Sequence, residues 1–341
     1  MKRILITGGA GFIGTNAALY YLKKDANVTV FDNFSRKGSE KNAKYISEKF
    51  RNNLQIVKGD VRDSGSKFNK LVKNCDLVLH LAGQVAVTTS VDNPSEDFEI
   101  NACGTLNVLE AIRRSNNNPV FIYSSTNKVY GDLNRLRITE KDTRYEFEKL
   151  PFGVSEETNL DFYSPYGCSK GAADQYVRDY ARIFGLNTIV FRQSCIYGPH
   201  QFGIEDQGWL AWFMIAVSKN RPITIYGNGK QVRDALYVDD LISAYDKAFV
   251  NISKTKGQIY NIGGGEKNTV SIWKEFSPIL EELFKKKIKP IFSQTRLGDQ
   301  KIYISDIRKS KKDFLWEPKT DLNTGLNKLY SWIVNNKNII K

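Results

Sequence analysis

A glycine-rich turn near the start of the chain reads Thr7-Gly8-Gly9-Ala10-Gly11-Phe12-Ile13-Gly14. It follows an apolar run typical of a buried strand and leads into a helical pattern. Gly8, Gly11 and Gly14 have the spacing at which one glycine permits a tight turn, one lets the backbone approach a pyrophosphate, and one permits close helix packing. The helix N-terminus at Phe12 and Ile13 would then face the anion. A plain tight turn is the alternative, but the strand before it and the helix after it favour a dinucleotide site.

Acidic residues after the next two predicted strands indicate which dinucleotide binds. Asp32 lies 18 residues past Gly14, where a carboxylate accepts both hydroxyls of the adenosine ribose and repels a 2′-phosphate. NAD is therefore the expected cofactor, and Arg36 keeps NADP open as an alternative. Asp60 is either an adenine contact or a helix N-cap. The cofactor contacts expected in this part of the chain are Gly8, Gly11, Phe12, Ile13, Gly14, Asp32, Asn33, Ser35, Arg36, Asp60 and Val61.

The first half of the chain alternates short apolar runs with amphipathic stretches, the rhythm of βαβ units around a parallel sheet. Strands are predicted at Arg3–Thr7, Asn27–Phe31, Leu54–Lys58, Leu77–Leu81, Val120–Ser124 and Thr188–Arg192. After residue 193 the elements become shorter and more aromatic, and no Pro/Gly/Ser linker separates the halves. We expect an α/β protein in which a Rossmann-type doubly wound parallel sheet, residues 1–193, carries a smaller mixed α/β substrate-binding domain, residues 194–341. Some of the second part is expected to return to the sheet.

A tyrosine and a lysine on one predicted helix suggest the chemistry. Tyr166 and Lys170 are four residues apart, so both side chains project from one face. A free phenol has a pKa of ~10, and bringing it near 7 takes about 4 kcal/mol of preferential stabilisation of the phenolate. Lys170 and the positive nicotinamide ring can supply this jointly. Thr126 ends the fifth strand, at the sheet edge where such folds bind ligands. These three residues are the predicted catalytic group. The alternatives are an ordinary polar pair on a helix and simple strand-end capping.

With these residues in place, the chain resembles the extended short-chain dehydrogenase/reductase family, the NAD-dependent sugar-nucleotide epimerases and dehydratases. The likeness runs nearly end to end. Its further motifs are His80-Leu81-Ala82-Gly83, Asn101 with Gly104-Thr105-Leu106-Asn107, Arg192 through Pro199, and Gly227 through Asp234. The resemblance implies a firmly held NAD, Tyr166 as the base, Lys170 on the nicotinamide ribose and Thr126 on the sugar. It adds further cofactor contacts at Leu81, Ala82, Gly83, Asn101 and Ser124.

The resemblance also implies residues that contact the substrate. Arg233 and Arg296 match positions that meet the substrate diphosphate. This chain departs from the family at Cys195, where many members carry an Asn that bonds the diphosphate; Gln193 and the segment around Gln207 are the expected replacements. The full set of expected substrate contacts is Thr88, Ser90, Thr126, Gln193, Gln207, Arg233 and Arg296. For Thr88 and Ser90, ordinary loop polarity is the alternative.

The residues after Thr126 help to choose among the reactions of the family. The 4,6-dehydratases carry an Asp-Glu pair there, one acid and one base for the loss of water, whereas this chain has Asn127-Lys128. An epimerase that oxidises and then reduces its substrate needs only the tyrosine, the lysine, a hydroxyl and NAD. Longer runs, such as 84–90 and 164–176, resemble family members that epimerise carbon 2 of a CDP-linked sugar. A 4-epimerase or another oxidoreductase acting on a UDP-, GDP- or dTDP-sugar is the alternative.

The charge of the chain raises the question of nucleic acid. The 341 residues include 50 Lys or Arg against 37 Asp or Glu, a net charge of +13. Residues 251–341 alone hold 18 basic against 9 acidic residues, in runs such as Lys285-Lys286-Lys287 without interleaved aromatics. This pattern favours a solvated surface over a nucleic-acid site. A dinucleotide-sensing regulator that uses the basic tail is a remote alternative, because it would be expected to lose the catalytic residues.

The remaining counts limit partners and compartment. The chain has 2 histidines and 4 cysteines without a C-x-x-C spacing, which argues against a metal site and fits a reducing cytoplasm. No apolar run reaches the ~20 residues of a membrane span. We therefore expect a cytoplasmic enzyme that binds a nucleotide sugar, with CDP favoured, and that binds no metal, nucleic acid or membrane. By analogy with the family, the long helices near 94–115 and 165–184 are expected to pair in a homodimer or homotetramer.

Overall fold

The computed structural model describes residues 1–63, 66–296 and 298–340. Its centre is a seven-stranded sheet in the order β12-β8-β5-β4-β1-β2-β3, in which every neighbouring pair is parallel. The strands are β1 (Arg3–Thr7), β2 (Asn27–Asp32), β3 (Leu54–Lys58), β4 (Leu77–His80), β5 (Val120–Thr126), β8 (Thr188–Gln193) and β12 (Ile259–Ile262). The order reverses between β1 and β4, which is where doubly wound folds open their ligand crevice. The predicted fold class is confirmed.

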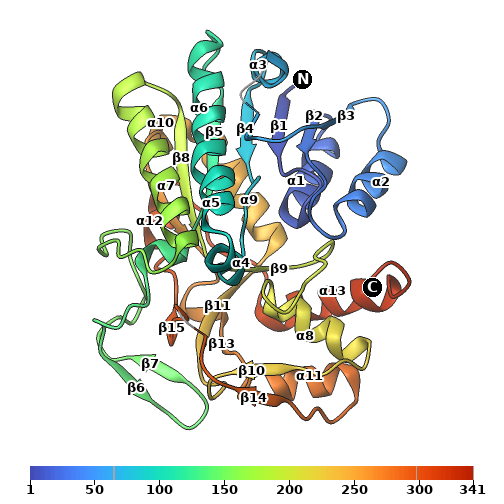
Figure 1. Ribbon diagram of the computed structural model, residues 1–341, viewed down its shortest axis with the longest axis vertical. Coiled ribbons are helices and arrows are strands. Elements are labelled where there is room, and N and C mark those ends of the chain that lie inside the picture. The colour runs from blue at the N-terminus through green and yellow to red at the C-terminus, as the bar shows by residue number, and fades with distance from the viewer. Residues whose placement is uncertain (64–65, 297, 341) are drawn as a thin grey trace.

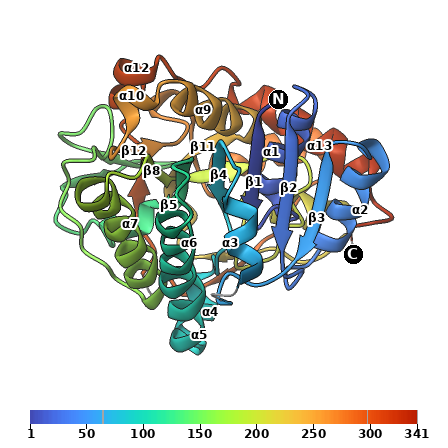
Figure 2. The same cartoon turned by 90° about the horizontal axis from the view of Figure 1, so that it is seen from above.

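Helices cover both faces of this sheet (Figure 2). Along one face lie α3 (Ser66–Val72), α6 (Gly104–Arg114) and α7 (Pro165–Phe184), and the other face carries α1 (Phe12–Leu22) and α9 (Val238–Val250). The other helices around the main sheet are α2 (Ser39–Lys49), α4 (Val87–Asp92), α5 (Pro94–Phe98), α10 (Ile252–Thr255) and α12 (Arg308–Phe314). A π-helical turn, Glu99–Cys103, joins α5 to α6, and a 3₁₀ turn, Asn127–Tyr130, follows β5.

The apolar core is split by the sheet into two layers. Ile4 and Ile6 of β1 belong to one buried cluster, whereas Leu5 between them belongs to the other. This alternation follows from the two-residue period of a strand. Because helices cover both faces, all three side chains are at most 1% exposed. The strands therefore carry near-continuous apolar runs, the pattern that made them visible in the sequence.

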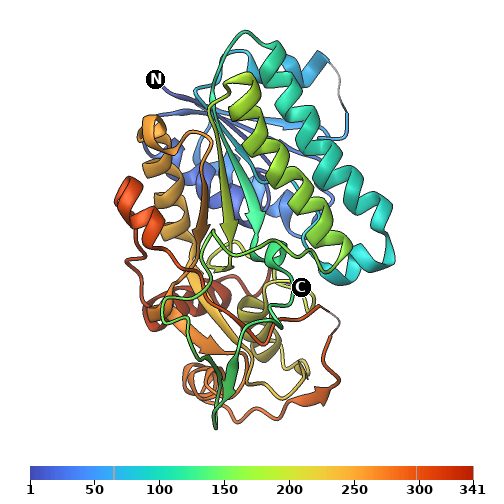
Figure 3. The same cartoon turned by 90° about the vertical axis from the view of Figure 1, so that its left-hand side faces the viewer.

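Smaller sheets gather at the end where the main strands finish (Figures 1 and 3). One has the order β13-β11-β15 with β9 also on β11; the others are the pair β10-β14 and the hairpin β6-β7. These strands are β6 (Ile138–Glu140), β7 (Tyr145–Phe147), β9 (Cys195–Tyr197), β10 (Thr224–Tyr226), β11 (Val232–Tyr237), β13 (Thr269–Ser271), β14 (Ile291–Ser293) and β15 (Ile302–Tyr303). Around them lie α8 (Trp209–Ser218), α11 (Phe276–Phe284), α13 (Leu322–Asn335) and a 3₁₀ turn, Glu266–Asn268.

The chain passes between the two parts more than once. β12 comes from residues beyond 193 yet completes the main sheet beside β8. The β6-β7 hairpin comes from residues before 193, and its Tyr145 shares a buried cluster with Val232 and Ile302 of the smaller sheets. The division at residue 193 stays a prediction. The predicted catalytic and substrate residues come from both stretches, with Thr126 and Tyr166 before residue 193 and Arg233 and Arg296 after it. No helix in the described ranges is both long and apolar enough to cross a membrane.

Candidate active site

The glycine turn between β1 and α1 is closed by backbone contacts. Gly8 has a φ of 64°, its N–H donates to the Phe31 carbonyl at 2.8 Å, and Gly11 N–H donates to the Gly8 carbonyl at 3.0 Å. A Cβ added to Gly14 would lie 2.4 Å from the Gly8 oxygen, and one added to Gly8 would lie 2.7 Å from the Ala82 nitrogen. These approaches exclude any side chain at Gly8 and Gly14.

The N-terminus of α1 opens beside this turn. Gly11 is its N-cap, and no side chain in the described part of the chain caps it. The first backbone N–H groups of the helix, at Phe12 and Ile13, are therefore available to an anion. The segment from Gly8 to Gly14, called the glycine cradle below, includes this uncapped helix N-terminus. This arrangement fits the pyrophosphate of a dinucleotide.

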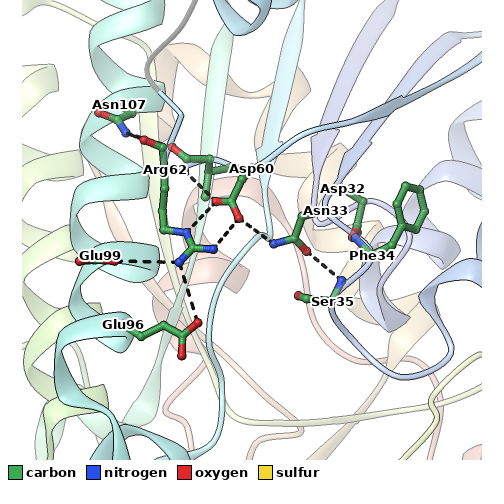
Figure 4. A network of polar contacts seen from close by, with 10 residues as sticks. Asp32, Asn33, Phe34, Ser35, Asp60, Arg62, Glu96, Glu99 and Asn107 are labelled. Carbon is green, nitrogen blue, oxygen red and sulfur yellow. Dashed lines mark hydrogen bonds and ion pairs between the residues drawn. The ribbon is translucent and has the colours of Figure 1, made fainter.

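Asp32 at the end of β2 is fixed by the backbone around it. Its carboxylate is 7% exposed and accepts hydrogen bonds from Ala10 N–H at 3.0 Å and Phe34 N–H at 2.8 Å. Burial raises the pKa of Asp32, and these backbone hydrogen bonds oppose that shift. The next residue, Asn33, accepts from Ser35 N–H at 3.0 Å and donates to Asp60 at 2.9 Å (Figure 4). The β2 and β3 loops are thus joined beside the glycine turn, and Asp32 is suitably placed to hold a ribose.

Asp60 at the end of β3 forms a pair that the sequence did not suggest. The Arg62 guanidinium donates to both oxygens, at 3.1 and 2.8 Å, and Arg62 N–H also donates to Asp60 at 2.9 Å. Arg62 lowers the pKa of Asp60 to about 2. Asp60 therefore closes a turn by accepting from the backbone N–H two residues later. Asn107 of α6 holds the same turn by donating to the carbonyls of Val61 and Arg62, each at 3.0 Å (Figure 4).

The structure brings the predicted catalytic residues together at the end of β5 and the start of α7. Ser164 caps α7 by accepting from Gly167 N–H at 3.0 Å, and Pro165 opens the helix. Thr126, Tyr166 and Lys170 are 7%, 8% and 4% exposed. Thr126 and Tyr166 share a hydrogen bond. The Lys170 ammonium donates to the Ser124 carbonyl and lies 4.4 Å from the centre of the Tyr123 ring.

Burial dominates the protonation of this group. It raises the pKa of Tyr166 to about 12, although the hydrogen bond with Thr126 acts in the opposite direction. It also lowers the pKa of Lys170 to about 7, against the opposing charges of Asp97 and Asp174. The protein groups alone therefore do not bring the phenol near neutral. The sequence-based prediction assigned that shift jointly to Lys170 and the charge of the oxidised nicotinamide.

Arg36 lies nearer to the catalytic tyrosine than the sequence suggested. It was predicted as a cofactor contact because it follows Asp32 on the β2 loop. The structure places its guanidinium close enough to Tyr166 to lower the pKa of the phenol. No sequence pattern connects these two residues.

The loop after β4 and the π-helical turn, Glu99–Cys103, both pack beside Lys170. Leu81 N–H and Ala82 N–H both donate to Thr7, at 3.1 Å to its carbonyl and 3.3 Å to its hydroxyl. A Cβ added to Gly83 would lie 2.9 Å from the Asn101 side-chain oxygen and 3.7 Å from the Lys170 nitrogen. Gly83 and Asn101 therefore lie directly beside Lys170, as expected of residues that line one pocket.

The arginines predicted to bind a diphosphate are paired with carboxylates of the chain. Arg233 of β11 lies 2.6 Å from Asp299, and Arg296 lies 2.8 Å from Asp206. Lys128 shares Asp299 at 3.9 Å and donates to the Gly298 carbonyl at 3.1 Å. Lys128 and Asp299 were not predicted as site residues, and the large sequence separation between Asp299 and its partners leaves no local signal.

Two of the other predicted substrate contacts, Ser90 and Gln193, use their side chains for hydrogen bonds within the protein. The Ser90 hydroxyl donates to the Val87 carbonyl at 2.7 Å, and Gln193 donates to the Tyr245 hydroxyl at 2.6 Å. Gln207 pairs through its backbone with Ile204. The Thr88 hydroxyl is buried without a hydrogen-bond partner in the described structure. Cys195, where many family members carry Asn, accepts from the Trp209 indole N–H at 2.9 Å.

Among the described residues, no group of three or more His, Cys, Asp or Glu side chains is arranged to hold a metal ion. The glycine cradle, Asp32 and the crevice beside Lys170 are instead suited to an organic dinucleotide. The residues that would hold NAD are the glycine turn for its pyrophosphate, Asp32 for the adenosine ribose and Lys170 for the nicotinamide ribose.

Comparison with known proteins agrees with this geometry. The profile of the NAD dependent epimerase/dehydratase family matches residues 4–263. The chain belongs to this family. It is 48% identical to CDP-paratose 2-epimerase from Salmonella typhi over 97% of this chain and 98% of that protein. It is 31% identical to a dTDP-glucose 4,6-dehydratase from Escherichia coli over 98% of this chain and 94% of that protein.

A solved structure extends the comparison to three dimensions. UDP-glucuronic acid 4-epimerase from Bacillus cereus, solved with UDP-glucuronic acid and NAD, matches with a TM-score of 0.84 and 27% identity. The match covers 98% of this chain and 99% of that one. The predictions of family, of an enzymatic role and of NAD as the cofactor are confirmed.

Proposed function

We propose that the protein interconverts CDP-paratose and CDP-tyvelose by epimerising carbon 2 through a transient 2-keto sugar. The observation that carries this proposal is the 48% identity to the CDP-paratose 2-epimerase of Salmonella typhi, which spans 97% of the chain. The chemistry after β5 supports it. Asn127 carries an amide and Lys128 an ammonium, so neither residue offers the acid and base carboxyls of a 4,6-dehydratase. Their side chains instead donate to Gln300 at 2.8 Å and to the Gly298 carbonyl at 3.1 Å.

The catalytic group acts on the hydroxyl of the carbon that is inverted. Thr126 and Tyr166 hold this hydroxyl, and Tyr166 takes its proton as the carbon is oxidised. When bound, NAD would supply the hydride acceptor for the oxidation and the hydride donor for the reduction. Tyr166 then gives the proton back after the ketone has presented its other face. Lys170 supports the charge of the phenolate, and its hydrogen bond to the Ser124 carbonyl fixes the position of the ammonium.

The proposed binding of the substrate rests on two positively charged arginines. Arg233 and Arg296 bind the diphosphate, and in the structure each holds a carboxylate at hydrogen-bond distance, 2.6 Å and 2.8 Å. Thr88, Ser90, Gln193 and Gln207 stay predictions as sugar or nucleotide contacts. CDP is proposed as the nucleotide from the relative rather than from a recognised base pocket.

A homodimer or homotetramer belongs to the same proposal. Apolar side chains are exposed on α7, with Tyr176 53%, Ile183 66% and Phe184 48% accessible. Such a patch on a long surface helix favours a helix-pairing interface. Sedimentation of the purified protein at two concentrations tests this, and a monomer at both would contradict it.

Deuterium labelling tests the reaction and its position. The NAD-loaded enzyme is given CDP-paratose with deuterium on carbon 2 or on carbon 4, and the products are followed by NMR. We expect CDP-tyvelose that retains the label, with a primary isotope effect only for carbon 2. An effect only for carbon 4 would identify a 4-epimerase. No epimer from any CDP-, UDP-, GDP- or dTDP-sugar would contradict the proposal altogether.

Replacing Tyr166, the proposed base, tests its role in the reaction. Tyr166→Phe removes the proton acceptor but keeps the ring that fills the pocket. Turnover should fall by about 10³-fold, in the range for a general base, while the bound NAD content stays unchanged. Lys247→Met, at a half-buried cation on α9 that donates to the Leu315 carbonyl, is the control and should leave turnover unchanged. Wild-type turnover by the Phe variant would remove Tyr166 as the base.

A further inference from the structure

A buried carboxylate lies beneath the catalytic helix and has no part in the reaction described so far. Asp97 of α5 is 1% exposed. It accepts from Gln84 at 2.9 Å, from Asn101 at 3.2 Å and from the Ser169 hydroxyl. Within the described part of the chain, these hydrogen-bond partners are all uncharged. A buried carboxylate is costly unless a positive charge or several donors compensate it.

The hydrogen bonds around this carboxylate favour its ionised form. The amides of Gln84 and Asn101 can only donate through nitrogen, so Asp97 is the acceptor in both contacts. Asn101 also donates to the Ser169 oxygen at 3.1 Å, and the Ser169 proton can point at Asp97 or at the Tyr166 carbonyl, 3.2 Å away. Three donors therefore converge on the carboxylate. This is the arrangement expected of the acceptor-only, charged form.

The network reaches the catalytic lysine from two sides. Ser169 immediately precedes Lys170 on α7, so its bond to Asp97 fixes the turn from which the lysine side chain starts. On the other side, the Asn101 oxygen and the Lys170 nitrogen both lie against Gly83, 2.9 and 3.7 Å from the position of a Cβ there. The π-helical turn, Glu99–Cys103, presents Asn101 at this place. Single π turns of this kind are frequent at functional sites.

We propose that Asp97 is a positioning residue of the active site, whose buried negative charge keeps the Lys170 ammonium protonated and directed at the Ser124 carbonyl. The inference rests on the proposed function of Lys170 as the cation that supports Tyr166. It is consistent with the balance at Lys170, where burial lowers the pKa and Asp97 is the larger of the two charges that raise it. Burial also raises the pKa of Asp97 itself, and the Lys170 charge opposes that shift.

A second carboxylate near Lys170 is already compensated. Asp174, one turn farther along α7, accepts from Arg192 at 2.9 and 3.0 Å and from the Ser125 hydroxyl at 2.8 Å. A carboxylate held by a guanidinium in this way presents little net charge to a neighbour. Asp97 has no such cation among its hydrogen-bond partners, so its charge acts more strongly on Lys170 than that of Asp174.

The other titratable groups that face Lys170 are neutral. His80 of β4 is fully buried between Thr7 and Thr105, and burial and the Lys170 charge lower its pKa to about 3. Tyr123 of β5 presents its ring face to the ammonium, and burial raises its pKa well above 10. Tyr166 lies one turn earlier on α7 with a pKa of about 12. None of them replaces the charge of Asp97 near neutral pH.

The direct test is the pKa of Lys170 in a variant without the charge. Asp97→Asn keeps the shape of the side chain, and its amide can still bond Gln84, Asn101 and Ser169 once the Ser169 hydroxyl turns. The ammonium is titrated by NMR of protein labelled with ¹³C at the lysine ε position, and its signal is identified by its loss in Lys170→Met. We expect the pKa of Lys170 to fall by about one unit or more.

The pH profile supplies a second readout. Lys170 supports Tyr166 only when protonated, so activity is lost as the pH rises through the Lys170 pKa. The alkaline limb of kcat/KM should therefore move to lower pH in Asp97→Asn by the same amount as the NMR value. A purely structural role would lower the melting temperature and leave the limb in place.

Two further variants keep the test decisive. Glu99→Gln removes a charge two residues away, from a side chain that is 59% exposed, and should leave the Lys170 pKa unchanged. Asp97→Ser is neutral and small, and replaces Asp97→Asn if the latter does not fold. An unchanged Lys170 pKa in either folded Asp97 variant would overturn the inference. Wild-type protein that turned over no CDP-sugar would contradict the proposed function and leave the NMR result interpretable.

Discussion

The cofactor end and the substrate end of the candidate active site are stabilised in different ways. At the cofactor end, polar groups are fixed mainly by the backbone: Asp32 accepts from two backbone N–H groups, at 3.0 and 2.8 Å. At the substrate end, charged side chains hold carboxylates of the same chain, as in Arg233–Asp299 at 2.6 Å and Arg296–Asp206 at 2.8 Å. The first end is preformed. The second must exchange a protein carboxylate for a ligand phosphate if the arginines bind the diphosphate as proposed.

This difference matches what each ligand has to do. A cofactor that is oxidised and reduced in one cycle gains from a rigid site, because losing it midway would leave the keto sugar unreduced. A substrate must enter and leave in every cycle, so part of its binding energy can be offset by internal ion pairs that re-form on release. Three predictions test this contrast.

Adding a side chain in the glycine cradle should have the largest effect on stability and on ligand affinity. Gly14→Ala places a Cβ 2.4 Å from the Gly8 oxygen and 2.5 Å from the Gly9 Cα, and neither backbone atom can move freely. We expect a loss of about 2 kcal/mol in unfolding free energy and a fall of about thirtyfold in NAD affinity. Denaturant unfolding and NAD titration measure both.

A glycine remote from the cradle provides the control. Gly185 ends α7 with a φ of 68°, and no described atom lies within 4 Å of an added Cβ. Gly185→Ala should cost about 1 kcal/mol through its left-handed backbone and leave NAD affinity unchanged. Wild-type NAD affinity in Gly14→Ala would show that the cofactor end is not rigid.

Removing the internal carboxylate at the substrate end should have a smaller effect of the opposite sign. Asp299→Asn frees Arg233 and removes the charge that Lys128 faces at 3.9 Å. Affinity for CDP, measured by calorimetry, should rise by about threefold to tenfold, whereas Arg233→Gln should lower it by about tenfold or more. Weaker CDP binding in Asp299→Asn would mean that Asp299 orients the arginine rather than competing with the ligand.

The sequence revealed the cofactor end far better than the substrate end, for the same physical reason. Gly8, Gly14 and Asp32 act through local backbone geometry, so their spacing along the chain carries the information. Tyr166 and Lys170 lie one helical turn apart, and their pairing is local as well. The strands were visible because burial on both faces demands continuous apolar runs.

Contacts between distant segments left no comparable pattern. Asp299 meets Arg233 across 66 residues of sequence, and Arg36 approaches Tyr166 through the fold alone. The π-helical turn that presents Asn101 has no composition that distinguishes it from an α-helix. β12 was not predicted; it pairs with β8 although 65 residues separate the end of one strand from the start of the other.

The smallest expected effect is on the unfolding free energy. It concerns the ion pair of Asp60 and Arg62 at the cofactor end, where other polar groups are held mainly by the backbone. Asp60 has a pKa of about 2 in the folded protein because of Arg62, against 3.8 for a free carboxyl. A depressed pKa adds stability that is fully present above the unfolded value and is lost as the pH falls toward the folded value. Arg62→Gln should therefore lower the unfolding free energy at pH 6, and the difference from wild type should shrink as the pH approaches 2.

Solvent exposure limits the size of that difference. The Arg62 and Asp60 side chains are 36% and 18% exposed, so we expect about 0.5–1 kcal/mol at pH 6 rather than the full value of the pKa shift. Arg135→Gln breaks a 3.2 Å pair with Asp161 in which both side chains are more than half exposed, and should change stability by less than about 0.3 kcal/mol. Urea unfolding at several pH values compares the two variants. If Arg62→Gln were as mild as Arg135→Gln at every pH, the β3 turn would be held by Asn107 and the backbone, and the cofactor end would need no charge pair for its rigidity.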